Sequence, residues 1–343
     1  MASAETASSQ LMTTPAHDSG SMPPRVVRLC ERDVTFPSAE LQQIEDSSAL
    51  LALPDGGEAL RARFARDGFV YLRGALGREA VLAAREAVVA PLRARGDVFD
   101  AATGLLLPAC GLGCLPNMEG VNGTTHAPAV RAVLEGAPLC AAVGALLAAP
   151  PAALRSFDYK WLRAMPRAAS TGVHADAVYM ARGTAELITA WIPMEARATL
   201  ELGSLAMLRG SQAASSLARV RATYGAFDTE AEPGFEGSGW LTSDAAELAH
   251  GGDVQWVGGD YEAGDVILFG LRTLHCSTAN ITDAVRVSCD VRWQRADEPC
   301  DERYVGSLEE MAAKRAARKA GGAWAAASAG AVTMADLRAR WGI

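Results

Sequence analysis

Hydrophobic residues change their spacing part-way along the chain. In residues 58–67, 79–95 and 128–147, apolar side chains recur at the period of an amphipathic helix. Residues 69–72 form a compact apolar run directly after Gly68, and this pattern predicts a short strand. We therefore expect a mainly helical N-terminal part that contains one strand.

From about residue 154 the pattern changes to short apolar runs separated by Gly, Pro, Asn and Asp. The runs that predict strands are 155–165, 172–180, 186–194, 204–208, 253–257, 265–269, 274–280 and 285–293. Short strands at this spacing are typical of a sandwich or a jelly roll. We therefore expect a mainly β fold with flanking helices, a core at about 154–294, and closing helices at 309–319 and 333–341.

Two segments do not share these patterns. Residues 1–45 begin with a stretch rich in Ser, Thr, Ala and Pro, so we expect a disordered tail ahead of a single domain at 46–343. Residues 211–252 carry little strand pattern but hold Phe235 and Trp240 among several glycines. Because long loops on a rigid scaffold often cover a site, we expect this insert to act as a lid.

Composition narrows the class of protein. Half of the 343 residues are hydrophobic, and a net charge of -8 without a basic stripe argues against nucleic acid binding. The seven cysteines are irregularly spaced, so we expect free thiols and a cytoplasmic location. Because apolar runs stay below about 18 residues, we expect no membrane span. These properties indicate an acidic, enzyme-like protein. We expect it to be a monomer or a homodimer.

A candidate metal site begins at His174-Ala175-Asp176, the only H-x-D sequence in a chain with five histidines. The match is weak alone, because a surface turn can carry the same pair. In an extended segment, residues i and i+2 point to the same side, so the imidazole and the carboxylate can converge. His275, which follows the apolar run 266–269, is the natural third ligand. Two histidines and one carboxylate form the facial triad that holds non-haem iron(II) with open coordination positions.

Two polar residues follow His275 at spacings that suit binding of a carboxylate. Arg286 lies 11 residues downstream on the next predicted strand, where a guanidinium can hold a carboxylate through two parallel hydrogen bonds. Ser277 shares the strand face of His275 and can add a hydroxyl donor. They predict a site for the distal carboxylate of 2-oxoglutarate, although an exposed strand arginine would give the same sequence at Arg286.

Four sequence motifs, at residues 64–72, 191–195, 202–212 and 264–286, together resemble the phytanoyl-CoA dioxygenase (PhyH) family. Residues 64–72 are similar to the family's helix-strand opening. Residues 191–195 and 202–212 resemble its tryptophan strand and the turn that follows, with Gln212 where the family often has histidine. Residues 264–286 resemble its distal motif.

The resemblance spans about residues 60–294 and implies a double-stranded β-helix (jelly-roll, cupin-like) core. It implies iron(II), with 2-oxoglutarate and O₂ as co-substrates, ascorbate as reductant, and hydroxylation of a small organic substrate with release of succinate and CO₂. It matches the iron ligands to His174, Asp176 and His275, and the co-substrate contacts to Arg286, Ser277, Trp191 and Lys160. Position near the site adds Tyr179, Arg182 and Trp293 as expected substrate contacts, with Met180 and Arg292 as further candidates.

Three alternatives remain open. An iron halogenase on this fold needs a vacant position where the carboxylate binds, so Asp176 argues against it. A non-catalytic jelly-roll protein can bind a metal or small ligand through the same residues, and metal-dependent succinate release would separate the two. A protein-modifying or nucleic-acid-modifying oxygenase is the third, and the acidic charge argues only against the nucleic acid.

Overall fold

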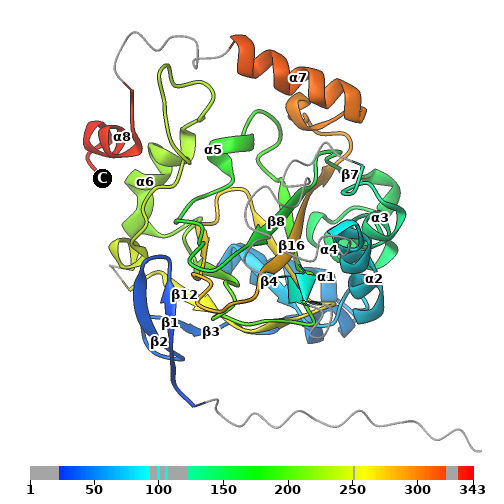
Figure 1. The fold of residues 1–343 in the computed structure, drawn as a ribbon. Coiled ribbons are helices and arrows are strands. Elements are labelled where there is room, and N and C mark those ends of the chain that lie inside the picture. Colours follow the sequence, from blue (N-terminus) through cyan, green and yellow to red (C-terminus); the bar gives the residue numbers. More distant parts are fainter. Residues whose placement is uncertain (1–22, 93–98, 101–104, 107–122, 250–251, 322–330) are drawn as a thin grey trace, which may run out of the picture.

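A six-stranded antiparallel sheet forms the centre of the protein (Figure 1). The computed structural model describes residues 23–343 except 93–98, 101–104, 107–122, 250–251 and 322–330. Four strands lie in the order β4 (Phe69–Leu72), β14 (Val266–Gly270), β9 (Ile188–Pro193) and β16 (Arg286–Arg295). Beyond them, β7 (Leu154–Ser156) and β8 (Trp161–Met165) both pair with β16.

A smaller sheet of four strands packs against the first. Its order is β15 (His275–Ser277), β11 (Leu205–Arg209), β12 (Gln255–Gly258) and β3 (Gln42–Gln43), the last of which pairs in parallel with β12. The core between the sheets contains Trp191 and Phe269 from the large sheet and Met207 and Val257 from the small one. The predicted mainly β fold with a jelly-roll core is therefore confirmed.

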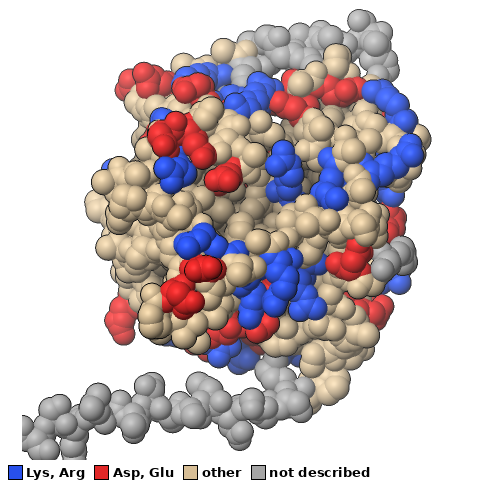
Figure 2. All heavy atoms as spheres, turned by 180° about the vertical axis from the view of Figure 1, so that it is seen from behind, with Lys and Arg blue, Asp and Glu red and all other residues tan. Residues whose placement is uncertain are grey.

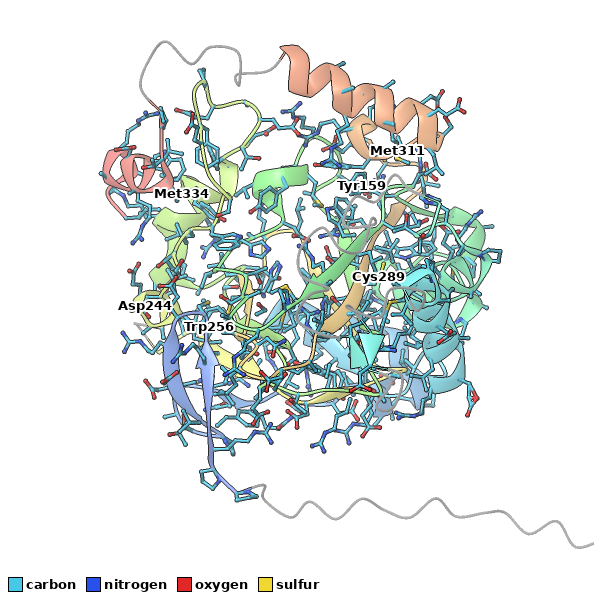
Figure 3. The ribbon with its side chains drawn as sticks, in the orientation of Figure 1. Tyr159, Asp244, Trp256, Cys289, Met311 and Met334 are labelled. Carbon is cyan, nitrogen blue, oxygen red and sulfur yellow. The ribbon has the colours of Figure 1, made fainter. Side chains whose placement is uncertain are left out.

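Strand β16 illustrates how alternation divides the side chains between two environments. Val287, Cys289 and Val291 belong to the core that the large sheet shares with the helices, where Cys289 is labelled in Figure 3. The intervening residues, Arg286 and Arg292 among them, are polar and also buried. Because successive side chains of a strand point to opposite faces, these polar residues face the interior of the jelly roll.

The helical layer explains why the central strands are apolar on their outer face. The helices are α1 (Gly56–Asp67), α2 (Arg78–Val89), α3 (Pro128–Leu134) and α4 (Ala137–Leu147), and they cover this sheet (Figure 1). The predicted strand at 69–72 and these predicted helices are confirmed. Helix α2 ends before Pro91, because proline cannot continue the helical hydrogen bonds.

The run Pro128–Leu147 has the length and mean hydropathy, 1.6, of a membrane-crossing helix. The structure divides it into α3 and α4, and apolar residues of both helices, such as Val133 and Val143, are buried in the core beneath the large sheet. Packing inside the protein buries 44% of the run and accounts for part of its apolar character.

The expectation of a disordered tail at 1–45 is wrong for residues 25–45. Strands β1 (Arg25–Leu29) and β2 (Arg32–Phe36) form a hairpin. Val27, Leu29 and Phe36 are buried with the outer face of the small sheet. The local signal is weak because the partners lie far away in the sequence, such as Ala279, whose N–H donates to the Arg28 carbonyl at 2.7 Å.

The insert packs against the C-terminal helix α8 (Met334–Trp341) beside the small sheet (Figure 1). The insert contains α6 (Ala218–Ala222), and the C-terminal helices are α7 (Leu308–Gly321) and α8 (Met334–Trp341). Trp341 lies 5.5 Å from Phe227 between ring centroids. Removing the insert would therefore uncover part of the core.

The remaining elements are short. They are β5 (Phe99–Asp100), β6 (Leu105–Leu106), β10 (Arg197–Ala198), β13 (Tyr261–Glu262), α5 (Ala177–Met180) and the 3-10 turns η1 (Ser48–Ala52), η2 (Ala90–Leu92), η3 (Pro151–Ala153), η4 (Ser215–Leu217), η5 (Tyr224–Ala226), η6 (Ala245–Leu248) and η7 (Glu302–Tyr304). The face in Figure 2 intersperses acidic and basic side chains. The five cysteines that the structure describes are free thiols, whereas Cys110 and Cys114 lie outside the described residues.

Candidate active site

The two candidate histidine ligands lie directly opposite each other on paired chain segments at the edge of the small sheet. His174 and His275 form an isolated antiparallel bridge, with N–H···O distances of 3.0 and 2.9 Å in the two directions. Their ring centroids are 4.2 Å apart. The backbone pairing therefore brings together two residues that lie far apart in the sequence.

Asp176 lies close to both histidines, but the backbone there is not extended as the sequence predicts. The segment 172–180 is not one strand: Asp176 has helical backbone angles, φ -61° and ψ -20°, and begins the short helix α5. The chain turns after His174 because it leaves the bridge there. One donor atom each from His174, Asp176 and His275 lie within 4.8 Å of one another, and all three residues are buried.

Backbone carbonyls select the nitrogen that each imidazole offers. Nδ1 of His174 lies 2.8 Å from the Gly172 carbonyl, and Nδ1 of His275 lies 3.0 Å from the Thr273 carbonyl. A carbonyl only accepts, so each Nδ1 carries the proton and donates. In the neutral ring, Nε2 then keeps a free lone pair for a metal.

The environment keeps both imidazoles neutral. Burial, followed by repulsion from His275, lowers the pKa of His174 to about 3. Burial also lowers the pKa of His275 below its ordinary value. Neutral imidazoles are the form that binds a metal, so the apoprotein site is already in the binding protonation state.

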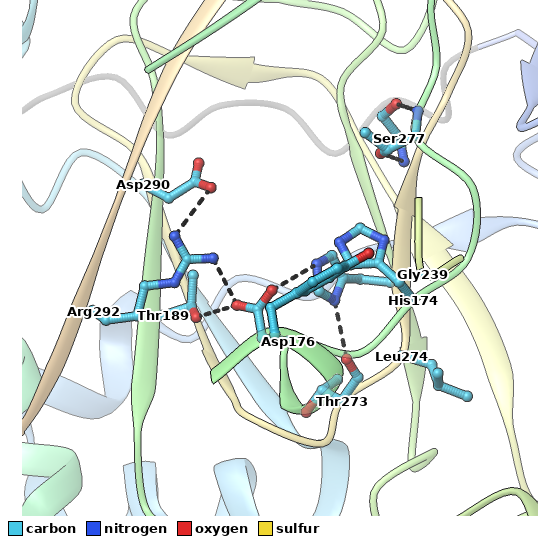
Figure 4. Close-up of polar contacts among 12 residues, drawn as sticks. His174, Asp176, Thr189, Gly239, Thr273, Leu274, Ser277, Asp290 and Arg292 are labelled. Carbon is cyan, nitrogen blue, oxygen red and sulfur yellow. Dashed lines mark hydrogen bonds and ion pairs between the residues drawn. The ribbon is translucent and has the colours of Figure 1, made fainter. Parts of the chain in front are cut away.

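The third ligand is also fixed by neighbours (Figure 4). Oδ2 of Asp176 accepts from Thr189 Oγ1 at 2.6 Å and from Arg292 at 2.8 Å. Burial alone would raise the pKa of Asp176, but the Arg292 guanidinium and the Thr189 hydroxyl lower it, so the carboxylate is ionised. With Oδ2 engaged, Oδ1 is the oxygen left to bind a metal.

Thr189 and Arg292 were not among the predicted ligand-positioning residues. The alternation of side chains between the two faces of a strand could have indicated both residues. Arg292 lies on the same face of its strand as Arg286, and Thr189 is two residues before Trp191. The contact with Asp176, however, depends on how β9 and β16 pair, and the sequence does not reveal that register.

The predicted co-substrate residues Arg286 and Trp191 lie together between the sheets. Arg286 is buried, its carbon Cζ is 5.7 Å from the Trp191 ring centroid, and its Nε has no hydrogen-bond partner. Burial lowers the pKa of Arg286 to about 10, which leaves it charged at neutral pH. A buried guanidinium with an unused donor fits a carboxylate ligand.

Ser277 is buried on the strand of His275 and already engages the opposite chain segment. Its Oγ accepts the Thr171 amide at 2.7 Å, and its own amide donates to Thr171 Oγ1 at 2.9 Å. A hydroxyl can accept and donate at once, so Ser277 keeps the donor capacity that the predicted carboxylate contact needs.

Lys160 lies away from the candidate iron site, contrary to the expected contact with the oxo acid. Its ammonium is buried, 2.6 Å from Glu135 Oε1 and 2.6 Å from the Phe157 carbonyl. Lys160 precedes β8 and its side chain turns outward to the α3–α4 junction. The strand begins only at Trp161, so the alternation of side chains along it does not predict where the Lys160 side chain points.

We expect Lys160→Ala to lower the free energy of unfolding by about 3 kcal/mol, because it removes one partner of a buried ion pair. The KM for 2-oxoglutarate should stay unchanged. Urea unfolding and steady-state kinetics measure the two quantities. A raised KM with unchanged stability would instead place Lys160 in the co-substrate site.

The three residues expected to contact the substrate lie in three different environments in the structure. Tyr179 lines the cavity described below, and its hydroxyl donates to the Ser238 carbonyl. Arg182 lies outside that lining and pairs with Asp228 at 2.6 Å. Trp293 is buried in the core shared with the helices, because its parity on β16 is opposite to that of Arg292.

A cavity of about 340 Å³ opens beside His174 and Asp176. Its described lining includes the aromatic residues Tyr159, Trp161, Tyr179, Trp240 and Tyr304 and the arginines Arg163, Arg292 and Arg315. Tyr159 is labelled near α7 in Figure 3, and Trp240 comes from the insert. Most of these residues were not predicted, since the C-terminal segment that supplies Tyr304 and Arg315 carries no local sign of facing the site.

The sequence profile of the phytanoyl-CoA dioxygenase (PhyH) family matches residues 64–288. This match covers more than half of the chain. The chain belongs to the phytanoyl-CoA dioxygenase family. The match includes His174, Asp176, His275 and Arg286, and the predicted resemblance is therefore confirmed. No curated protein matches the sequence.

Solved structures similar to this PhyH-family chain are related to it at low sequence identity. The epimerase SnoN in complex with Fe³⁺, alpha ketoglutarate and nogalamycin RO is 20% identical, with a TM-score of 0.49 over 72% of this chain and 86% of that one. The non-haem monooxygenase ThoJ–Ni complex is 17% identical, with a TM-score of 0.49 over 76% and 98%. EvdO2 from Micromonospora carbonacea var. aurantiaca, complexed with 2-oxoglutarate, is 17% identical, with a TM-score of 0.41 over 72% and 96%.

Family membership and the buried His-Asp-His cluster together make this chain an Fe/2-oxoglutarate-dependent oxygenase. The donor set agrees with that class, since two imidazoles and one carboxylate form the facial triad of non-haem iron.

Proposed function

We propose that the protein hydroxylates a small organic substrate, with iron(II) held by Nε2 of His174, Oδ1 of Asp176 and Nε2 of His275. The observation that carries the proposal is the placement of three donor atoms within 4.8 Å of one another. The atoms not used for binding are already hydrogen-bonded to neighbours. Such fixed outer partners orient ligands before the metal arrives.

The proposed reaction converts substrate, O₂ and 2-oxoglutarate into hydroxylated product, succinate and CO₂. When bound, iron supplies activation of O₂, coupled to decarboxylation of the oxo acid. Arg286 would hold the distal carboxylate of 2-oxoglutarate, Ser277 would donate to it, and Trp191 would pack beside it. The cavity next to His174 and Asp176 has neither Arg286 nor Trp191 in its described lining, which supports it as the place for the substrate.

A succinate assay tests this function. The full-length protein would be incubated with iron(II), 2-oxoglutarate and ascorbate, and candidate substrates would be screened for succinate above the substrate-free background. We expect at least one candidate to raise succinate and to gain one oxygen atom by mass spectrometry. Bound metal without succinate under any condition would favour a non-catalytic ligand-binding protein. Stimulation by peptides alone would favour a protein-modifying oxygenase.

We further propose that the insert covers the substrate as a lid. Its chain pairs with the segment next to His174: the Leu241 amide donates to the Val173 carbonyl at 2.8 Å, and the Val173 amide donates to the Thr242 carbonyl at 2.8 Å. This pairing supports Trp240 in the cavity lining. The cavity side of the insert would thus limit access of water to the reacting groups.

Trp240→Ala should lower the ratio of hydroxylated product to succinate, because the substrate loses a wall while the iron site stays intact. The ratio would be measured with a substrate found in the screen above, together with iron content. Trp240→Phe keeps an aromatic ring and should retain most of the coupling. Equal ratios in the wild-type protein and Trp240→Ala would exclude the proposed role of the lid.

A further inference from the structure

The cavity beside the candidate iron site collects positive charge in an acidic protein. The whole chain has a formal net charge of -8, yet the described lining holds three arginines and one carboxylate, Asp176. Asp290 adds a second carboxylate, shared by Arg163 at 3.2 Å and Arg292 at 3.4 Å. Once a divalent metal and the metal-binding carboxylate of 2-oxoglutarate are added, the positive charge still exceeds the negative charge, even without Arg315.

Arg163 is the arginine best placed to meet an anion. It lies on the interior face of β8, and about a third of its side chain, 30%, is exposed. Its Nε donates to Asp290, which fixes the guanidinium. The terminal nitrogens carry the other N–H donors, and this planar fork matches the two oxygens of a carboxylate.

Aromatic rings form the apolar part of the same cavity. Five of its described lining residues are Phe, Tyr or Trp types, in a chain where these types make up 6% of residues. Tyr159 and Trp161 lie 4.4 Å apart between ring centroids, and Tyr304 lies 5.3 Å from Trp161. Flat walls of this kind favour a planar ligand, because rings gain from offset or edge-to-face contact.

We propose that this oxygenase acts on a small aromatic carboxylate, which places its ring between the aromatic side chains and its carboxylate on Arg163. The inference rests on the proposed function and names its substrate class. A volume of about 340 Å³ suits a compact molecule of this kind. Arg292 donates to Asp176, so Arg163 is the main partner for the substrate carboxylate. Arg292 contacts both the candidate iron ligand Asp176 and the substrate cavity.

Binding of four probes to the metal-loaded protein tests the proposal without turnover. The protein would be kept anaerobic with iron(II) and saturating 2-oxoglutarate, and binding would be followed by tryptophan fluorescence, since Trp161 and Trp240 line the cavity. The probes are benzoate, benzamide, cyclohexanecarboxylate and phenyl phosphate. We expect benzoate to bind about tenfold more tightly than benzamide, as for one charge-assisted hydrogen-bonded pair. Benzoate should also bind more tightly than the other two probes.

Arg163→Gln should remove the preference for benzoate over benzamide and leave 2-oxoglutarate binding unchanged. Arg163→Lys should keep part of the preference, because it keeps the charge but loses the fork. The matched control is Arg167→Gln, which removes one surface charge from a residue that pairs with Asp283 outside the cavity. If Arg163→Gln does not fold, Arg315→Gln on α7 tests the same cavity from a surface helix.

Equal binding of benzoate and benzamide, or no binding of either, would contradict the proposal that the site recognises a carboxylate. Equal binding of benzoate and cyclohexanecarboxylate would contradict the preference for an aromatic ring. Tighter binding of phenyl phosphate would show that the site prefers a phosphate to a carboxylate. Weaker 2-oxoglutarate binding in Arg163→Gln would make Arg163 a co-substrate residue instead. Benzoate selectivity without succinate formation from any substrate would contradict the hydroxylase function alone.

Discussion

Alanine in place of His174, Asp176 or His275 is expected to abolish succinate formation and to weaken iron(II) binding. Each residue contributes one of the three donor atoms that lie within 4.8 Å of one another. Loss of partners that only orient ligands typically costs about 10–100-fold in metal affinity or activity, so loss of a ligand itself should cost more. Iron content after dialysis and the rate of succinate formation measure the two effects.

The matched control is His126→Ala. His126 lies in a loop, and its Nε2 is 2.9 Å from the Asp158 carbonyl rather than near the triad. Its activity should match that of the wild-type protein. Because Asp176→Ala removes the nearer of the two carboxylates that pair with Arg292, thermal unfolding should accompany each assay. Near-normal turnover in any folded triad variant would remove that residue from the set of ligands.

Arg286→Lys is expected to raise the KM for 2-oxoglutarate by about 10-fold to 100-fold, the equivalent of roughly 1.5–3 kcal/mol for a charge-assisted hydrogen-bonded pair. A lysine keeps the charge but loses the planar fork and the unpartnered Nε of Arg286. At saturating 2-oxoglutarate, most of kcat should return, because the iron ligands are untouched. Steady-state kinetics with varied 2-oxoglutarate measures both parameters.

Arg197→Lys serves as the control, since Arg197 is exposed and pairs with Asp260 outside the core. It should leave the KM for 2-oxoglutarate unchanged. An unchanged KM in Arg286→Lys would mean that another cation holds the distal carboxylate. Arg163 and Arg292, which face the same interior, would then be the first alternatives to examine.

The elements whose signal is local could be predicted from the sequence. The period of apolar residues predicted the helices at 58–67 and 128–147, because a helix that covers a sheet must present an apolar face at that spacing. Short runs between turn residues predicted most strands of the jelly roll. The H-x-D pair, His275 and Arg286 stood out because few residue types can bind iron and an oxo acid.

Which of these residues come into contact depends on how distant segments pair and pack in the folded chain. The strand register brings Thr189 and Arg292 within hydrogen-bonding distance of Asp176 and directs Trp293 toward the helices. A shift of one residue would exchange the two faces of β16. Lys160 turned outward to Glu135, and residues 25–36 folded against a sheet formed much later in the chain. These outcomes depend on partners that are distant in sequence, so no local pattern of spacing contains them.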